Sequence, residues 1–152
     1  PDTIAKLPEL KMDGDRDVNG RNYSYSYKMT SNDTLPVVTS FTGQRYYDNE
    51  VLLTVSSNEG EILRRTFTKK SFSDFIPLAK MKEISLVGFN YYMAKDEDHS
   101  NLFFIAMIGD PEDNDENLYA IEICVSSSGV VQLSKADLTV FETGPSDYAD
   151  EV

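Results

Sequence analysis

The stretch RNYSYSYKM, residues 21–29, decides the fold class of this chain. Tyr23, Tyr25 and Tyr27 alternate with polar residues in it, and Met29 continues the series. Successive side chains of a β-strand point to opposite faces of a sheet, so a period of two is typical of a strand with one buried face. The stretch therefore predicts a half-buried strand.

The same period recurs in a predicted hairpin. Val51, Leu53 and Val55 occupy alternate positions, a turn that ends at Gly60 follows, and residues 62–67 form a second extended run. Glycine adopts a positive φ at little cost, which a tight hairpin turn requires. The two runs are therefore expected to pair as neighbours.

The rest of the chain is a series of short apolar segments separated by turn residues. Further strands are predicted at residues 35–41, 84–93, 102–108, 118–125, 130–133 and 138–141. One short helix is predicted near residues 69–76, because Phe72, Phe75 and Ile76 share one helical face and Pro77 follows them. The connections are too short for the crossovers of a parallel sheet. We therefore predict an all-β fold, an antiparallel meander of about eight strands that forms a sandwich or a partly open barrel.

Composition divides the chain into three parts. Residues 1–19 hold two prolines and an acidic run, which predicts an irregular leader or tether. Residues 20–142 carry the strand patterns and are predicted to form a single β domain. Residues 143–152 hold Gly144, Pro145 and several carboxylates, which predicts a flexible acidic tail.

The chain is strongly acidic. Its 152 residues include 26 Asp and Glu against 14 Lys and Arg, a formal net charge of −12. Such a surface repels phosphate backbones, so nucleic acid is not an expected partner. The longest apolar run, residues 102–108, is much shorter than the roughly 18 residues needed to span a bilayer, so no membrane span is expected.

The hexapeptide DRDVNG, residues 15–20, resembles the first half of a calcium-binding loop. Asp15, Asp17 and Asn19 would supply oxygens at the first, third and fifth positions, and a glycine would allow the sharp turn. The twelfth position is Ser26, where the loop needs a glutamate, so an EF-hand is excluded.

A second acidic window lies at residues 110–116 and contains Asp113 and Asp115. If the leader reaches that turn, the two windows could bind calcium together. The ligands of this candidate metal site would be Asp15, Asp17, Asn19, Asp113 and Asp115. No other cofactor is expected, and the favoured alternative is that these carboxylates only keep loops solvated and discourage edge association.

Residues for nucleophilic catalysis are scarce. His99 is the only histidine and follows Asp96, Glu97 and Asp98, whose charges favour its protonated form. Cys124 is the only cysteine, and its apolar strand pattern predicts packing rather than reactivity. We therefore expect no enzyme, although a hydrolase that uses two carboxylates stays open because the sequence does not give their separation.

Tyrosines offer another candidate binding surface. Tyr46-Tyr47, Tyr91-Tyr92 and the stripe in residues 23–27 could stack on sugar rings if they were exposed beside a groove. The alternative is that they pack as cross-strand pairs on a half-buried sheet.

Several short motifs carry a resemblance to a known family. They are Leu35-Pro36-Val37-Val38, Tyr47-Asp48-Asn49, the alternation Val51, Leu53 and Val55, then Gly60, Arg65-Thr66-Phe67-Thr68-Lys69 with Phe72, and, more weakly, Gly88-Phe89. With them, residues 20–140 resemble an uncharacterised domain-of-unknown-function family of Bacteroidetes cell-envelope lipoproteins. The motifs mark a hairpin and a helix cap rather than a reaction, so no catalytic residue is carried over.

The resemblance implies an exported protein, in the periplasm or at the cell surface, lipid-anchored through a cysteine in a segment before Pro1. The expected function is non-enzymatic: a structural or partner-binding domain whose partner is an unknown protein or glycan. The alternatives are a glycan- or peptide-binding surface module and, less favoured, a carboxylate-dependent hydrolase.

Overall fold

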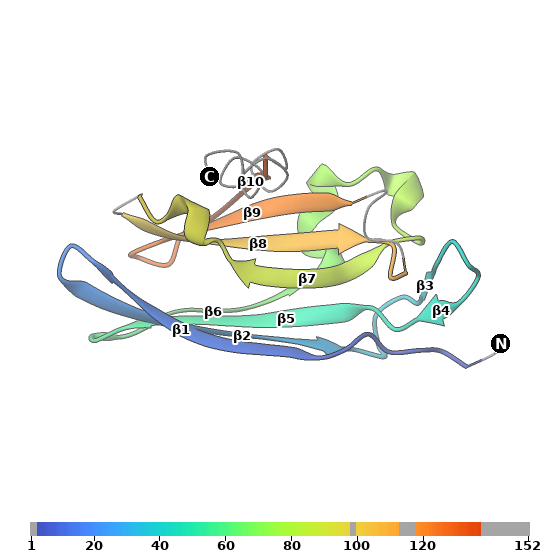
Figure 1. Ribbon diagram of the computed structural model, residues 1–152, viewed down its shortest axis with the longest axis horizontal. Helices are drawn as coiled ribbons and strands as arrows, with labels where there is room; N and C mark the ends of the chain where they lie inside the picture. Colours follow the sequence, from blue (N-terminus) through green and yellow to red (C-terminus); the bar gives the residue numbers. More distant parts are fainter. Residues whose placement is uncertain (1–2, 98–99, 113–117, 138–152) are drawn as a thin grey trace, which may run out of the picture.

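The computed structural model of this chain describes residues 3–97, 100–112 and 118–137. Two layers of antiparallel strands lie one above the other (Figure 1). The strands are β1 (Leu10–Val18), β2 (Arg21–Ser31), β3 (Val38–Thr39), β4 (Arg45–Tyr46), β5 (Asn49–Ser57), β6 (Gly60–Thr68), β7 (Ser85–Tyr91), β8 (Asn101–Gly109), β9 (Tyr119–Ser126) and β10 (Val131–Lys135). Within the described residues, the connections contain the short 3-10 helices η1 (Lys69–Phe75), η2 (Leu78–Lys80) and η3 (Met93–Lys95).

Strand order follows the chain closely. The first sheet has the order β1-β2-β5-β6, the second has the order β10-β9-β8-β7, and β3 pairs with β4 in a small hairpin between β2 and β5. Every strand pair in these sheets is antiparallel. The predicted all-β antiparallel fold is confirmed, and of the two predicted architectures the described strands form the sandwich.

The predicted strand at residues 21–29 is β2, and its tyrosines lie between the sheets. Tyr23 and Tyr27 are buried, while Tyr25 is half-buried. The ring of Tyr27 lies 5.0 Å from that of Phe89 in β7, and the ring of Tyr25 lies 5.4 Å from that of Phe104 in β8. These aromatic contacts join the first sheet to the second across the core.

The prediction of an irregular leader at residues 1–19 was wrong for Leu10–Val18, which forms β1 and pairs with β2 from Leu10↔Met29 to Val18↔Arg21. Asn19 (φ 53°) and Gly20 (φ 81°) form the turn between the two strands. An Asn-Gly pair is a strong hairpin signal, because a type I′ turn needs two left-handed residues. In this chain Asn19 and Gly20, the last two residues of the calcium-like motif, form the hairpin turn between β1 and β2.

The alternation of apolar and polar residues typical of a strand is not evident in the sequence of β1. Its outward positions carry Lys11 and three aspartates, but two of its inward positions are Gly14 and Arg16 rather than apolar residues. Gly14 lies directly under the ring of Tyr25, where a Cβ atom would approach the tyrosine oxygen to 2.3 Å. The glycine therefore allows Tyr25 to lie across the edge strand.

The predicted hairpin and helix are both confirmed. β5 pairs with β6, and Gly60 in their turn has a φ of 127°. Helix η1 follows β6, its residue Phe72 is buried, and the Oγ atom of Ser71 accepts a hydrogen bond from the amide of Thr68 (3.0 Å). Helix η1 begins where β6 ends, and its residues help to line the candidate site described below.

Other boundaries differ from prediction. Of the predicted strand at residues 35–41, only Val38–Thr39 is a strand; Pro36 cannot donate to a ladder, and its segment runs along the surface. The predicted strand at 138–141 and the tail at 143–152 lie outside the described residues. No helix in the described part of the chain is long and apolar enough to cross a membrane.

Candidate functional site

A hollow of about 380 Å³ opens at the end of the sandwich where β5 begins and β6 ends. Four segments that are separate in the sequence form it: the loop after β2, the residue before β5, helix η1 with the end of β6, and the η2 turn. Its lining residues are Leu35, Pro36, Asp48, Thr68, Lys69, Lys70, Ser73, Leu78 and Met81.

We call this cavity the end hollow. Its wall displays apolar side chains to solvent. Leu78 is 89% exposed. Its turn is nevertheless ordered by backbone hydrogen bonds, from the amide of Lys80 to the carbonyl of Pro77 (2.9 Å) and from the amide of Met81 to the carbonyl of Leu78 (3.2 Å). The leucine is therefore held outward by a defined turn.

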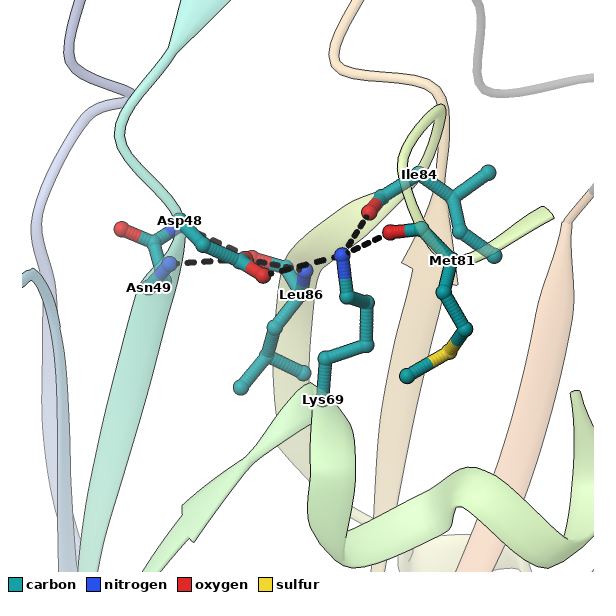
Figure 2. Close-up of polar contacts among 6 residues, drawn as sticks. All are labelled: Asp48, Asn49, Lys69, Met81, Ile84 and Leu86. Carbon is teal, nitrogen blue, oxygen red and sulfur yellow. Dashed lines mark hydrogen bonds and ion pairs between the residues drawn. The ribbon is translucent and has the colours of Figure 1, made fainter. Parts of the chain in front are cut away.

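The floor of the end hollow contains a buried ion pair. The Nζ atom of Lys69 lies 3.3 Å from Oδ2 of Asp48, and the two side chains are 9% and 3% exposed. Figure 2 shows the same Nζ atom donating hydrogen bonds to the carbonyls of Ile84 (2.6 Å) and Met81. All three ammonium hydrogens thus have an acceptor.

Asp48 also connects the two sheets. Its Oδ1 atom accepts hydrogen bonds from the amides of Asn49 (2.8 Å) and of Leu86 in β7 (3.0 Å). The Nδ2 atom of Asn49 in β5 donates to the carbonyl of Leu86 (2.8 Å; Figure 2). We call this arrangement of Asp48, Asn49, Lys69 and Leu86 the sheet bridge.

The sheet bridge is suited to holding structure. A lysine nucleophile or base needs access to a substrate, whereas the Nζ atom of Lys69 is buried and surrounded by three protein acceptors. The Asp48 carboxylate likewise accepts two amide hydrogens in addition to the ion pair. Lys70, at the mouth of the end hollow, makes no ion pair with any described residue and is exposed.

A second, polar hollow of about 340 Å³ is lined in part by the loop after β2. Its lining residues are Lys6, Ser31, Asn32, Asp33, Tyr47 and Glu50. Asn32 is already engaged, since its Nδ2 atom donates to Glu50 (2.7 Å) and its Oδ1 atom accepts from the amide of Thr34 (2.8 Å). The polar groups of this hollow are therefore partly occupied by one another.

Two carboxylates that follow β8, Asp110 and Glu112, accept hydrogen bonds from the β3–β4 hairpin. Asp110 is buried; its carboxylate accepts hydrogen bonds from Ser40 Oγ (2.9 Å) and from the amide of Phe41 (2.8 Å). Glu112 accepts one from the hydroxyl of Tyr46, and this bond, more than burial and nearby carboxylates, raises the pKa of Tyr46 to about 12. These two carboxylates fasten the β3–β4 hairpin to the second sheet.

The structure describes three of the five predicted calcium ligands. Asp15 and Asp17 lie on the outward side of β1, and Asn19 lies in the hairpin turn. Between them, Arg16 donates to the carbonyl of Asn101, the first residue of β8, whereas Asp110 follows the last residue of that strand.

The remaining predicted ligands, Asp113 and Asp115, lie outside the described residues, so the five-residue calcium site stays a prediction. Among the residues that the structure does describe, no group of three or more His, Cys, Asp or Glu side chains could hold a metal ion.

The predicted catalytic candidates do not form a described site. His99 lies outside the described residues. Cys124 in β9 is half-buried, and it packs against an apolar cluster that includes Phe103 and Ile105. That environment agrees with the prediction of a packed cysteine.

The tyrosines do not form an exposed row. Besides Tyr23 and Tyr27, Tyr92 is buried, and the ring of Tyr91 stacks on that of Tyr25 at 4.5 Å. The alternative of cross-strand and cross-sheet packing therefore describes them. Tyr47 lines a polar hollow.

Sequence reasoning missed the end hollow and the sheet bridge. Asp48 and Lys69 stood in the motifs that carried the family resemblance, but nothing in the sequence indicated that they would be buried together. Charged residues are rarely buried, so a pattern of apolar residues does not find them. Leu35 and Pro36 were likewise part of those motifs and of a predicted strand, without any indication that they line a hollow.

Residues 1–133 match the family described as Domain of unknown function (DUF4738). No curated protein matches the chain. The match agrees with the resemblance to a domain of unknown function, and it spans β1 and the whole of both hollows. Since it covers most of the chain, this protein belongs to the DUF4738 family.

Proposed function

We propose that this domain is a non-enzymatic binding module of the cell envelope that captures a peptide segment of a partner protein in the end hollow. It would work without a cofactor. The observation that carries the proposal is the apolar wall of Leu35, Pro36, Leu78 and Met81, in which Leu78 is 89% exposed on a hydrogen-bonded turn.

The exposed Leu78 side chain, carried by an ordered turn, favours binding of an apolar group. Ligand sites are typically concave, of about 300–1,000 Å³, with an apolar lining and a few polar groups. An apolar anchor whose backbone is already ordered costs little conformational entropy on association. Both conditions are met at the end hollow, whose polar groups include Ser73 and Thr68.

The absence of a chemical step is supported by how the ionisable groups of the site are used. Asp48 and Lys69 are saturated by each other and by backbone groups. Asp110 is occupied by the β3–β4 hairpin. A hydrolase that uses two carboxylates would need them free on opposite sides of a substrate.

Export rests on the family resemblance. Under this proposal the natural protein is a lipoprotein of the Bacteroidetes type, anchored by a lipidated N-terminal cysteine in the periplasm or at the cell surface. Fatty-acid labelling of the native full-length protein, followed by fractionation, tests this part. Labelled protein is expected in the membrane fraction, and unlabelled protein in the cytoplasmic fraction would contradict it.

Peptide titration tests the binding part. We expect an acetylated and amidated peptide, glycine-asparagine-leucine-asparagine-glycine, to shift the ¹⁵N-amide resonances of the segments that line the end hollow. Leu78→Ser should abolish these shifts. Leu52→Ser, at a partly exposed position on the outward face of β5, is the matched control and should retain them.

A glycan is the second candidate ligand, favoured by the polar hollow. Tyr47 could stack on a sugar ring there, and Asp33 and Lys6 could bind its hydroxyls. Shifts confined to Lys6, Asp33 and Tyr47 on titration with oligosaccharides, without any response to the peptide, would favour this alternative.

A further inference from the structure

The unbalanced charge at the end hollow is positive, although the chain carries a net charge of −12. Its lining holds one carboxylate, Asp48, and two lysines, Lys69 and Lys70. Asp48 and Lys69 neutralise each other in the sheet bridge. This leaves the exposed Lys70 ammonium at the mouth.

Two more lysines are close in sequence to lining residues, although they are not in the lining themselves. Lys80 lies between the lining residues Leu78 and Met81, and Lys82 comes next in the chain. Neither makes an ion pair with any described residue. Two carboxylates, Asp74 and Glu83, are also close in sequence, but neither belongs to the lining.

We infer that the end hollow selects a peptide segment in which an apolar anchor side chain is flanked by carboxylates. This inference deepens the proposed function and rests on it. The apolar wall would take the anchor, and Lys70 would pair with the acidic side chains. Ser73 at the lining offers a hydroxyl to the peptide main chain, a partner that an acyl chain would not need.

The expected gain in peptide affinity follows from the exposure of Lys70. Exposed ion pairs contribute only a few tenths to about 1 kcal/mol. A carboxylate beside the anchor should therefore tighten binding by about three- to fivefold at low salt. The effect should shrink as salt screens the charges.

Two matched peptides test the inference. We expect glycine-aspartate-leucine-aspartate-glycine to bind about three- to fivefold more tightly than its asparagine counterpart in NMR titrations. Lys70→Gln should reduce this ratio to below about twofold. Lys28→Gln, at an exposed position in β2 on the outer face of the first sheet, is the control and should leave the ratio unchanged.

The outcomes separate the two proposals. Equal affinity for the two peptides, or a ratio unaffected by Lys70→Gln, would overturn the charge inference and leave peptide capture standing. Absence of binding by both peptides would overturn both proposals.

Vesicles provide a further test. If vesicles of phosphatidylglycerol and phosphatidylcholine sediment the wild-type domain but not Leu78→Ser, the hollow contacts a lipid surface and the peptide inference is wrong. Because Leu78 is exposed, this variant should keep the wild-type melting temperature.

Discussion

Two regions join the sheets of this sandwich, and they do so by different physics. In the middle of the core, aromatic rings from β2, β7 and β8 lie at centroid distances of 4.5–5.9 Å. At one end, the sheet bridge connects Asp48 and Asn49 to Leu86 through hydrogen bonds and the ion pair with Lys69. Packing of the rings depends mainly on apolar contact, whereas the bridge depends on hydrogen bonds and an ion pair between particular atoms.

This difference indicates separate roles. Apolar burial is non-directional and supplies most of the free energy of folding. A buried ion pair adds little net stability, because desolvation of the charges offsets their attraction, but loss of one partner is costly. We therefore interpret the aromatic region as the source of stability and the bridge as the device that fixes η1 and the η2 turn around the end hollow.

The largest expected effect comes from removing one charge of the bridge. Lys69→Met leaves the Asp48 carboxylate buried without its ion pair, so we expect it to lower the free energy of unfolding by about 3–5 kcal/mol. Urea denaturation followed by circular dichroism measures this loss.

A double variant distinguishes charge from packing. Asp48→Asn combined with Lys69→Met removes both charges, and an asparagine oxygen can still accept from the amide of Leu86. We expect the double variant to be more stable than Lys69→Met alone. If the losses simply add, Asp48 and Lys69 are not coupled, and the interpretation of the bridge is wrong.

A smaller effect is expected in the aromatic region, where neighbouring side chains can partly close a void. Phe104→Leu keeps an apolar side chain at a fully buried position, so we expect a loss of about 1–2 kcal/mol in the free energy of unfolding. Phe41→Leu, at a ring that is 70% exposed, is the matched control and should change it by less than about 0.5 kcal/mol. A loss at Phe104 as large as that of Lys69→Met would remove the contrast between the two regions.

The sequence predicted the first of these regions and not the second. Alternation places Tyr25 and Tyr27 on one face, and opposing faces of a sandwich must meet, so an aromatic core follows from the pattern alone. Lys69 and Asp48 are 21 positions apart, and their pairing depends on how η1 turns after β6. No local pattern encodes that turn or the burial of two charges.

β1 shows a related limit. Its pairing with β2 was signalled by Asn19-Gly20, but the acidic side chains favoured a loop interpretation. Arg16 occupies an inward position because the edge of the sandwich lets its guanidinium reach Asp96, 3.3 Å away. An edge strand can tolerate such polar inward positions, so the apolar alternation of β1 is weak.

A pH-dependent contribution comes from the polar border of the aromatic region. Burial, and then the hydrogen bond to Asp96, raise the pKa of Tyr91 above its ordinary value. The folded state thus holds this proton more tightly than the unfolded state. The resulting stability is fully present below pH 10 and should be lost as the pH rises above it.

Tyr91→Phe tests this contribution. We expect it to cost about 1 kcal/mol at pH 7, the worth of one hydrogen bond, and to make the alkaline decrease in the free energy of unfolding shallower. Urea denaturation at pH 7 and between pH 9 and 11 measures both. An unchanged alkaline slope would mean that other tyrosines, such as Tyr46, account for it.

The smallest expected effect has the opposite sign and concerns the residue beside the bridge. Ser85 precedes Leu86 and is fully buried, and among the described residues its Oγ atom has no hydrogen-bond partner. A buried hydroxyl without a partner loses its hydration and gains nothing in return. Ser85→Ala removes that hydroxyl with little change in volume, so the free energy of unfolding should rise by up to about 1 kcal/mol. The expected gain is a slightly higher midpoint in urea at an unchanged slope. If Ser85→Ala instead destabilises the domain, the hydroxyl has a partner in the folded protein, and the polar network that joins the sheets extends beyond Asp48, Asn49 and Lys69.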